Sequence, residues 1–107
     1  MTEIKIPFNE WSKRKLILGT KIATSRNKRY GEIGDTFKVV FEDFNREDRE
    51  YQLTAILPLM LSHVGIFLYK IEGAESSQEF HDVWCDIHKR AGWTPSKTVY
   101  VHFFEEL

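Results

Sequence analysis

The longest apolar run of the chain, Leu53–Tyr69, restricts the folds that are open to it. The run holds seventeen residues, fewer than the roughly 20 that a membrane-spanning helix needs. Polar or helix-breaking residues also interrupt it, namely Thr54, Pro58, Ser62, His63 and Gly65. We therefore expect no membrane span here, but a buried strand, a break near Pro58 or Ser62–His63, and then a helix.

Capping signals and apolar spacing predict the first two helices. Asn9 is a favoured N-cap residue and Gly19 a favoured C′ residue, which predicts a helix that ends at about Leu18. A second helix is expected after His63 and should end at Glu72–Gly73. Its apolar residues recur at helical spacing: Val64, Phe67, Leu68 and Ile71.

A third helix is predicted from a capping box. The Ser76 hydroxyl and the Glu79 carboxylate are each expected to accept a hydrogen bond from the other residue's backbone N–H. The helix should end near Gly92. One face of it is apolar and comprises Phe80, Val83, Trp84 and Ile87.

Runs of β-branched and aromatic residues predict four strands, at about 21–26, 37–41, 51–57 and 98–103. The first is a strand or an extended loop. A turn is expected at 30–35 and a hairpin loop at 43–50, and Pro58 limits how far the third strand can remain central in a sheet. The order α-β-β-β-α-α-β predicts an α+β fold, built on a small, mainly antiparallel sheet or open β-barrel with flanking helices.

Length and cysteine content narrow the class of protein further. The 107 residues suffice for one hydrophobic core, so we expect a single domain over residues 1–107. The single Cys85 excludes an internal disulfide bond and a cysteine-based zinc knuckle within one chain. The N-terminal residues show no targeting signal, and together with the single cysteine this suggests a cytoplasmic location.

The charge is unevenly distributed along the chain. The formal net charge is -1, but residues 13–29 contain seven basic residues and no acid, a local charge of +7. Residues 30–107 carry seven bases and fourteen acids. The basic run is either a solvated surface or a site for phosphate or nucleic acid, and its length without one acid favours the site.

Three segments resemble motifs of the ASCH domain family, whose fold is PUA-like. Residues 19–26 read GTKIATSR, similar to the family's GxKxxTxR signature, and Gly34-Asp35 follows at the expected distance. Residues 72–80 read EGAESSQEF, with Trp84 after them, similar to a later family segment. The resemblance implies a β-barrel with flanking helices, a cleft lined by the first motif, and an association with RNA.

The resemblance also implies site residues, because some small stand-alone members are amidohydrolases that deacetylate N4-acetylcytidine. Their catalytic lysine, threonine and glutamate fall on Lys21, Thr24 and Glu72, with Glu75 as a competitor for the last. In this hypothesis Thr24 attacks an amide carbonyl, Lys21 takes its proton, and Glu72 protonates the leaving amine. Residues three apart on a strand point to opposite faces, so Lys21 and Thr24 converge only if the segment bends.

In the binding interpretation, cations of the basic run and an aromatic neighbour contact RNA or a modified pyrimidine nucleoside. The residues expected to do so are Arg26, Lys28, Arg29 and Tyr30. Trp93 is a further stacking candidate, whereas the other two tryptophans are expected in the core. Of the two function classes, binding is the favoured hypothesis and amide hydrolysis is the alternative.

No metal or cofactor is expected. His81, Cys85 and His88 share one stripe of the third helix and could bind zinc, but the flank of an amphipathic helix is the favoured interpretation.

Overall fold

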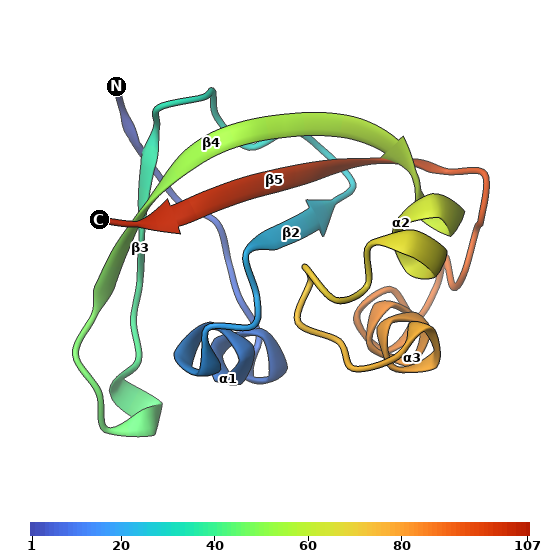
Figure 1. Ribbon diagram of the computed structural model, residues 1–107, viewed down its shortest axis with the longest axis horizontal. Helices are drawn as coiled ribbons and strands as arrows, with labels where there is room; N and C mark the ends of the chain where they lie inside the picture. Colours follow the sequence, from blue (N-terminus) through green and yellow to red (C-terminus); the bar gives the residue numbers. More distant parts are fainter.

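The computed structural model describes residues 1–107 as a five-stranded sheet with three α-helices (Figure 1). The elements in chain order are β1 (Glu3–Ile4), α1 (Glu10–Leu18), β2 (Ala23–Arg26), β3 (Thr36–Val39), a short 3₁₀ helix (Glu42–Phe44), β4 (Arg49–Met60), α2 (Leu61–Phe67), α3 (Ser77–Ile87) and β5 (Thr98–Glu106). The sheet order is β1-β3-β4-β5-β2. Only β1 and β3 pair in parallel, and the other three pairings are antiparallel.

The α+β class and the mainly antiparallel sheet are therefore confirmed, whereas a closed barrel is not. β1 and β2 are the two edges of the sheet and do not pair with each other. The long β4–β5 pair curves strongly, and α1 and α3 lie on its concave side with β2 between (Figure 1). Residues of α1, β2 and α3 line a cavity.

β4 is longer than expected, and the strand pairing around Pro58 shows why this is possible. The strand was predicted to end at about Leu57, but it continues to Met60. β3 pairs only with residues 49–52 of β4, while β5 pairs with residues 51–60. At Pro58, β4 therefore has one neighbour instead of two, and the missing N–H of proline does not interrupt a second ladder.

The second helix differs most from its prediction. α2 begins at Leu61 and ends at Phe67, so Ile71 and Glu72 lie beyond it in turns. The backbone carbonyl of Ile71 instead accepts hydrogen bonds from the N–H groups of Ile22 (2.9 Å) and Ala23 (3.1 Å). The expectation that Glu72–Gly73 ends a helix is wrong, because these residues are held beside the start of β2.

The caps of the other two helices are largely as predicted. The Asn9 side chain accepts from the Ser12 N–H, and Gly19 follows α1 in a left-handed conformation. Ser76 Oγ accepts from the Glu79 N–H, but the Glu79 carboxylate accepts from Glu75 rather than from Ser76.

α3 is shorter than expected and ends at Ile87, five residues before Gly92. In the last turn of the helix, the Trp84 carbonyl oxygen accepts a hydrogen bond from the His88 backbone N–H. The Nδ1 atom of the His88 ring also lies within hydrogen-bond distance of this oxygen. No helix of the chain has the length and apolar character needed to cross a membrane.

Two buried apolar clusters flank the sheet. The first comprises Ile6, Leu16, Phe37, Val39, Phe41, Tyr51, Leu53, Ile56 and Phe104. The second comprises Ala23, Leu61, Val64, Ala74, Phe80, Trp84, Val99 and Val101. Phe8 packs against the first cluster and Trp11 against the second, and both also line the cavity described below.

Candidate functional site

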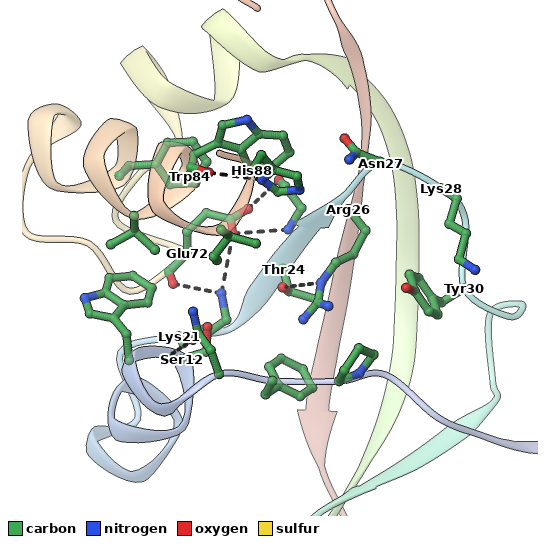
Figure 2. A pocket seen from close by; sticks show the side chains of 18 residues that line it. Ser12, Lys21, Thr24, Arg26, Asn27, Lys28, Tyr30, Glu72, Trp84 and His88 are labelled. Atoms are coloured by element: carbon green, nitrogen blue, oxygen red, sulfur yellow. Dashed lines mark hydrogen bonds and ion pairs between the residues drawn. The ribbon is translucent and has the colours of Figure 1, made fainter. Parts of the chain in front are cut away.

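A cavity of about 510 Å³ lies between the segment that leads into α1, the strand β2 and the helix α3 (Figure 2). Its polar lining comes mainly from residues 21–28 and from Glu72. Its apolar lining includes Phe8, Trp11, Tyr30 and one face of α3. Polar groups that converge inside an apolar pocket of this size are typical of small-ligand sites.

Gly73 brings the Glu72 segment against α1 and β2. Its φ is +100°, a left-handed conformation that side chains rarely adopt. A Cβ atom at this position would lie 2.8 Å from the Lys15 Cβ and 3.2 Å from the Lys21 Cβ. Glycine therefore permits both the turn and the close approach that places Glu72 beside Lys21.

Lys21 and Glu72 form a buried ion pair in this cavity. The Lys21 Nζ atom donates to the Glu72 backbone carbonyl oxygen at 3.0 Å and to its Oε1 atom at 3.4 Å. Burial lowers the pKa of Lys21 by penalising its charged form; the charge of Glu72 opposes this effect, and the nearby Arg26 adds to it. The result is an ammonium group that gives up its proton more readily than an exposed lysine.

Ser25 holds the other side of the Glu72 carboxylate. Its backbone N–H donates to Oε1 at 3.1 Å, and its hydroxyl donates to Oε2 at 2.6 Å. Ser25 lines the cavity and was not among the predicted site residues. A hydroxyl next to the motif threonine was the sequence signal that could have marked Ser25 as a site residue. Its partner, Glu72, is 47 positions away in the sequence, so the contact itself could not be predicted.

Thr24 and Arg26 form a second polar pair in the cavity. The Arg26 Nε–H donates to Thr24 Oγ1 at 3.1 Å, as Figure 2 shows. The guanidinium carbon lies 4.9 Å from the centre of the Phe8 ring and 5.9 Å from that of Tyr30. These aromatic faces hold the guanidinium by cation–π attraction.

His102 supports the cavity wall at Tyr30 from inside the sheet. Its ring is completely buried, and its Nε2 atom accepts from the Tyr30 backbone N–H at 2.9 Å. The Nδ1 atom lies 2.9 Å from the Tyr100 carbonyl oxygen, to which it donates in the neutral ring. Burial lowers the pKa of His102, which favours this neutral form.

Most cations of the basic run are paired with acids and are therefore not available to bind an anion. Four of its members pair with acids: Arg14 with Glu10, Lys15 with Glu79, Lys21 with Glu72, and Arg29 with Glu32. Lys13, Arg26 and Lys28 form no ion pair, and only the last two of these line the cavity. The cationic part of the site is therefore Arg26 and Lys28 rather than the whole run.

α3 supplies one wall of the cavity, a role that its sequence did not predict. The predicted apolar face of α3 lines the cavity, and His88 extends this face by one further position. The His88 ring stacks on Trp84, with 4.0 Å between the ring centres. Helical spacing from Phe80 and Trp84 was the signal that could have placed His88 there.

The structure thus brings most of the predicted site residues together. Six of them line the cavity: Lys21, Thr24, Arg26, Lys28, Tyr30 and Glu72. Lys21 and Thr24 share it because Lys21 precedes the first residue of β2, so the alternation of the strand does not separate them. Arg29 is exposed and bonded to Glu32, outside the cavity.

Three other candidates lie elsewhere. Glu75 is exposed and does not line the cavity. Trp93, the further stacking candidate, packs against Gly65 and Phe80 and does not line the cavity. His81, Cys85 and His88 do not form a group that could hold a metal ion.

These features describe an α+β fold with a half-open, partly cationic pocket. No family model and no curated protein matches the sequence. A comparison of structures matches an ASCH domain from Lactobacillus crispatus JV V101, with a TM-score of 0.65 and 12% sequence identity. The match covers 98% of this chain and 78% of that one. The chain therefore has the fold of an ASCH domain, as its motifs predicted.

Proposed function

We propose that this domain binds RNA or a nucleoside in the cavity between β2 and α3. The proposal rests on one observation: two cations without an acidic partner, Arg26 and Lys28, line the same pocket as several aromatic side chains. Cations neutralise phosphate and aromatic rings stack on bases, which is the combination typical of sites for single-stranded nucleic acid. The ASCH fold is consistent with such a role.

The polar groups inside the cavity favour a ligand that presents hydrogen-bond acceptors. Lys21 donates to Glu72 through two contacts and keeps a third N–H. The Thr24 oxygen accepts from Arg26, so its own hydrogen remains available. Arg26 uses only Nε in this bond and keeps its terminal nitrogens for a phosphate or a carbonyl.

The volume of the cavity limits the ligand to one unstacked base or nucleoside. A pocket of about 510 Å³ is within the size range of small-molecule sites. A base inside a duplex would have to leave the stack to enter, so single strands should bind more tightly than duplexes. Lys28, whose Nζ lies 5.0 Å from the centre of the Tyr30 ring, would contact the adjoining phosphate.

The test is the affinity of purified protein for a labelled single-stranded RNA and for the same sequence as a duplex. We expect tighter binding of the single strand, and a loss of about tenfold for each of Arg26→Ala and Lys28→Ala. Lys38→Ala is the matched control, because Lys38 is exposed on β3 and lies outside the cavity. Equal loss in Lys38→Ala, or no loss in the other two variants, would refute the proposal.

A second candidate is hydrolysis of N4-acetylcytidine or a related amide. It is favoured by one observation: Lys21, Thr24 and Glu72 line the same cavity, and burial lowers the pKa of Lys21. Thr24 would attack the amide carbonyl, Lys21 would take its proton, and Glu72 would protonate the leaving amine. Incubation with N4-acetylcytidine should then yield cytidine, and full turnover by Thr24→Ala would contradict these roles.

A further inference from the structure

The two neighbouring hydroxyl groups of β2 have opposite hydrogen-bonding roles. Thr24 Oγ1 accepts a hydrogen bond from the positively charged Arg26 at 3.1 Å. Ser25 Oγ donates one to the Glu72 carboxylate at 2.6 Å. Both residues are more than nine-tenths buried, and both line the cavity.

This difference changes which hydroxyl can act as a nucleophile. A cationic donor on Thr24 Oγ1 occupies a lone pair and draws electron density from the oxygen, which weakens it as a nucleophile. A carboxylate that already accepts the Ser25 hydrogen can take that proton as the oxygen attacks, which is how a serine is activated. The Lys21 Nζ atom bonds to Glu72 and not to Thr24, so no base is in contact with the threonine hydroxyl.

We propose that Ser25 is the acyl-accepting residue of this cavity, with Glu72 as its proton acceptor and Lys21 as a hydrogen-bond donor to the carbonyl oxygen. This inference rests on the hydrolase candidate described above and reassigns the roles within it. It concerns amides or esters of small carboxylic acids, and water is the second substrate.

The steps balance as follows for an amide. Ser25 Oγ bonds to the carbonyl carbon, its proton passes to Glu72 Oε2, and the carbonyl electrons move onto the oxygen. When the carbonyl re-forms, the C–N bond breaks, and the leaving nitrogen takes the proton from Glu72. Water then attacks the acyl-serine and gives a proton to Glu72; the ester C–O bond breaks, and Ser25 Oγ recovers that proton as the carboxylic acid leaves.

A donor for the carbonyl oxygen is also in the cavity, because Lys21 keeps one N–H beyond its two contacts to Glu72. Donors directed at the oxygen that becomes negative supply a large share of the rate enhancement in acyl transfer. Thr24 precedes Ser25 on β2, so its side chain points to the other face of the strand. Its removal should therefore lower the rate less than the removal of Ser25.

The test is to trap the acyl group and locate it. The protein is incubated with p-nitrophenyl acetate, quenched in acid, and digested with trypsin, which cleaves after Lys21 and Arg26. The resulting peptide, Ile22–Arg26, contains both Thr24 and Ser25, and fragmentation between them in the mass spectrometer identifies the acetylated residue. We expect acetyl-Ser25 in the wild type and in Thr24→Val, and none in Ser25→Ala.

Turnover of N4-acetylcytidine gives the second measurement. Ser25→Ala should lose at least roughly 100-fold in rate, whereas Thr20→Ala, which removes an exposed hydroxyl outside the cavity, should leave the rate unchanged. The melting temperature of each variant shows whether it is folded, and Ser25→Cys restores a nucleophile if Ser25→Ala is not.

Each outcome of these measurements is decisive. Acetylation at Ser25 with loss of turnover in Ser25→Ala supports the inference. Acetylation at Thr24 or only at surface lysines overturns it, and so does the absence of both acetylation and turnover. Failure of the hydrolase would leave RNA binding intact, which the binding assay with Arg26→Ala measures separately.

Discussion

The Nζ atom of Lys21 lies 3.4 Å from Oε1 of Glu72, and the two side chains are only 3% and 4% exposed. A buried ion pair of this kind ties β2 to the segment after α2 across 51 positions of the sequence. Removing one partner leaves the other charge buried without compensation, whereas removing both leaves an apolar contact. The pair is therefore a determinant of stability as well as the polar centre of the cavity.

The first prediction concerns this pair. Lys21→Met and Glu72→Leu should each lower the free energy of unfolding by about 3–5 kcal/mol. The double variant should recover most of that loss, because no unpaired charge remains. Urea denaturation of the four proteins measures the coupling, and additive losses would show that the two charges do not stabilise each other.

The second prediction concerns the glycine beside the pair. Gly73→Ala should destabilise the protein by about 2–4 kcal/mol, because it combines a left-handed backbone with crowding against Lys15. Gly34→Ala separates the two effects, since Gly34 has a φ of +95° but nothing within 4 Å of an added Cβ. It should lose only about 1 kcal/mol. Equal losses in the two variants would contradict the close approach at Gly73.

The third prediction concerns pH. His102 is buried, and burial lowers its folded-state pKa from the ordinary 6.5. Between pH 6.5 and the lower folded-state pKa, the unfolded chain is therefore protonated at His102 while the folded chain is not, which favours unfolding. Stability should therefore be fully present above pH 6.5 and should fall as the pH drops toward the folded pKa. The control is His102→Gln, in which this part of the pH dependence should disappear from the free energy of unfolding. An unchanged profile would contradict the buried neutral ring.

The fourth prediction concerns the salt dependence of RNA binding. If only Arg26 and Lys28 contact phosphate, the slope of log K against log salt should be about -1.4, since each contact on a single strand adds about -0.7. Seven contacts from the whole basic run would give about -5. Each of Arg26→Ala and Lys28→Ala should remove about one contact from the slope, and Arg29→Ala should remove none.

Local signals explain what could be predicted from the sequence. Asn9, Gly19 and Ser76 mark helix ends through contacts within a few residues, so the caps of α1 and the start of α3 were predictable. The resemblance to ASCH domains implied a cleft at the motif segment 19–26, and four residues of that segment line the cavity. The pocket-facing side of α3 also follows from helical spacing, although its role as a cavity wall does not.

Contacts between distant segments explain what was missed. α2 ends at Phe67, and the Ile71 carbonyl beyond it bonds to the N–H groups of Ile22 and Ala23; local propensity carries no information about those partners. The Ser25–Glu72 bond has the same origin. The basic run could not be resolved into paired and unpaired cations, because Lys15 and Lys21 pair with acids more than fifty residues away.

The most direct test of RNA or nucleoside binding uses the three tryptophans of the chain as probes within one spectrum. Trp11 and Trp84 line the cavity, and Trp93 packs against Gly65 outside it. The measurement is a titration of ¹⁵N-labelled protein with a short single-stranded RNA, observing the three indole N–H resonances. We predict that the Trp11 and Trp84 resonances shift together to saturation while that of Trp93 stays in place. Stationary Trp11 and Trp84 resonances, or an equal shift of Trp93, would contradict binding in this cavity.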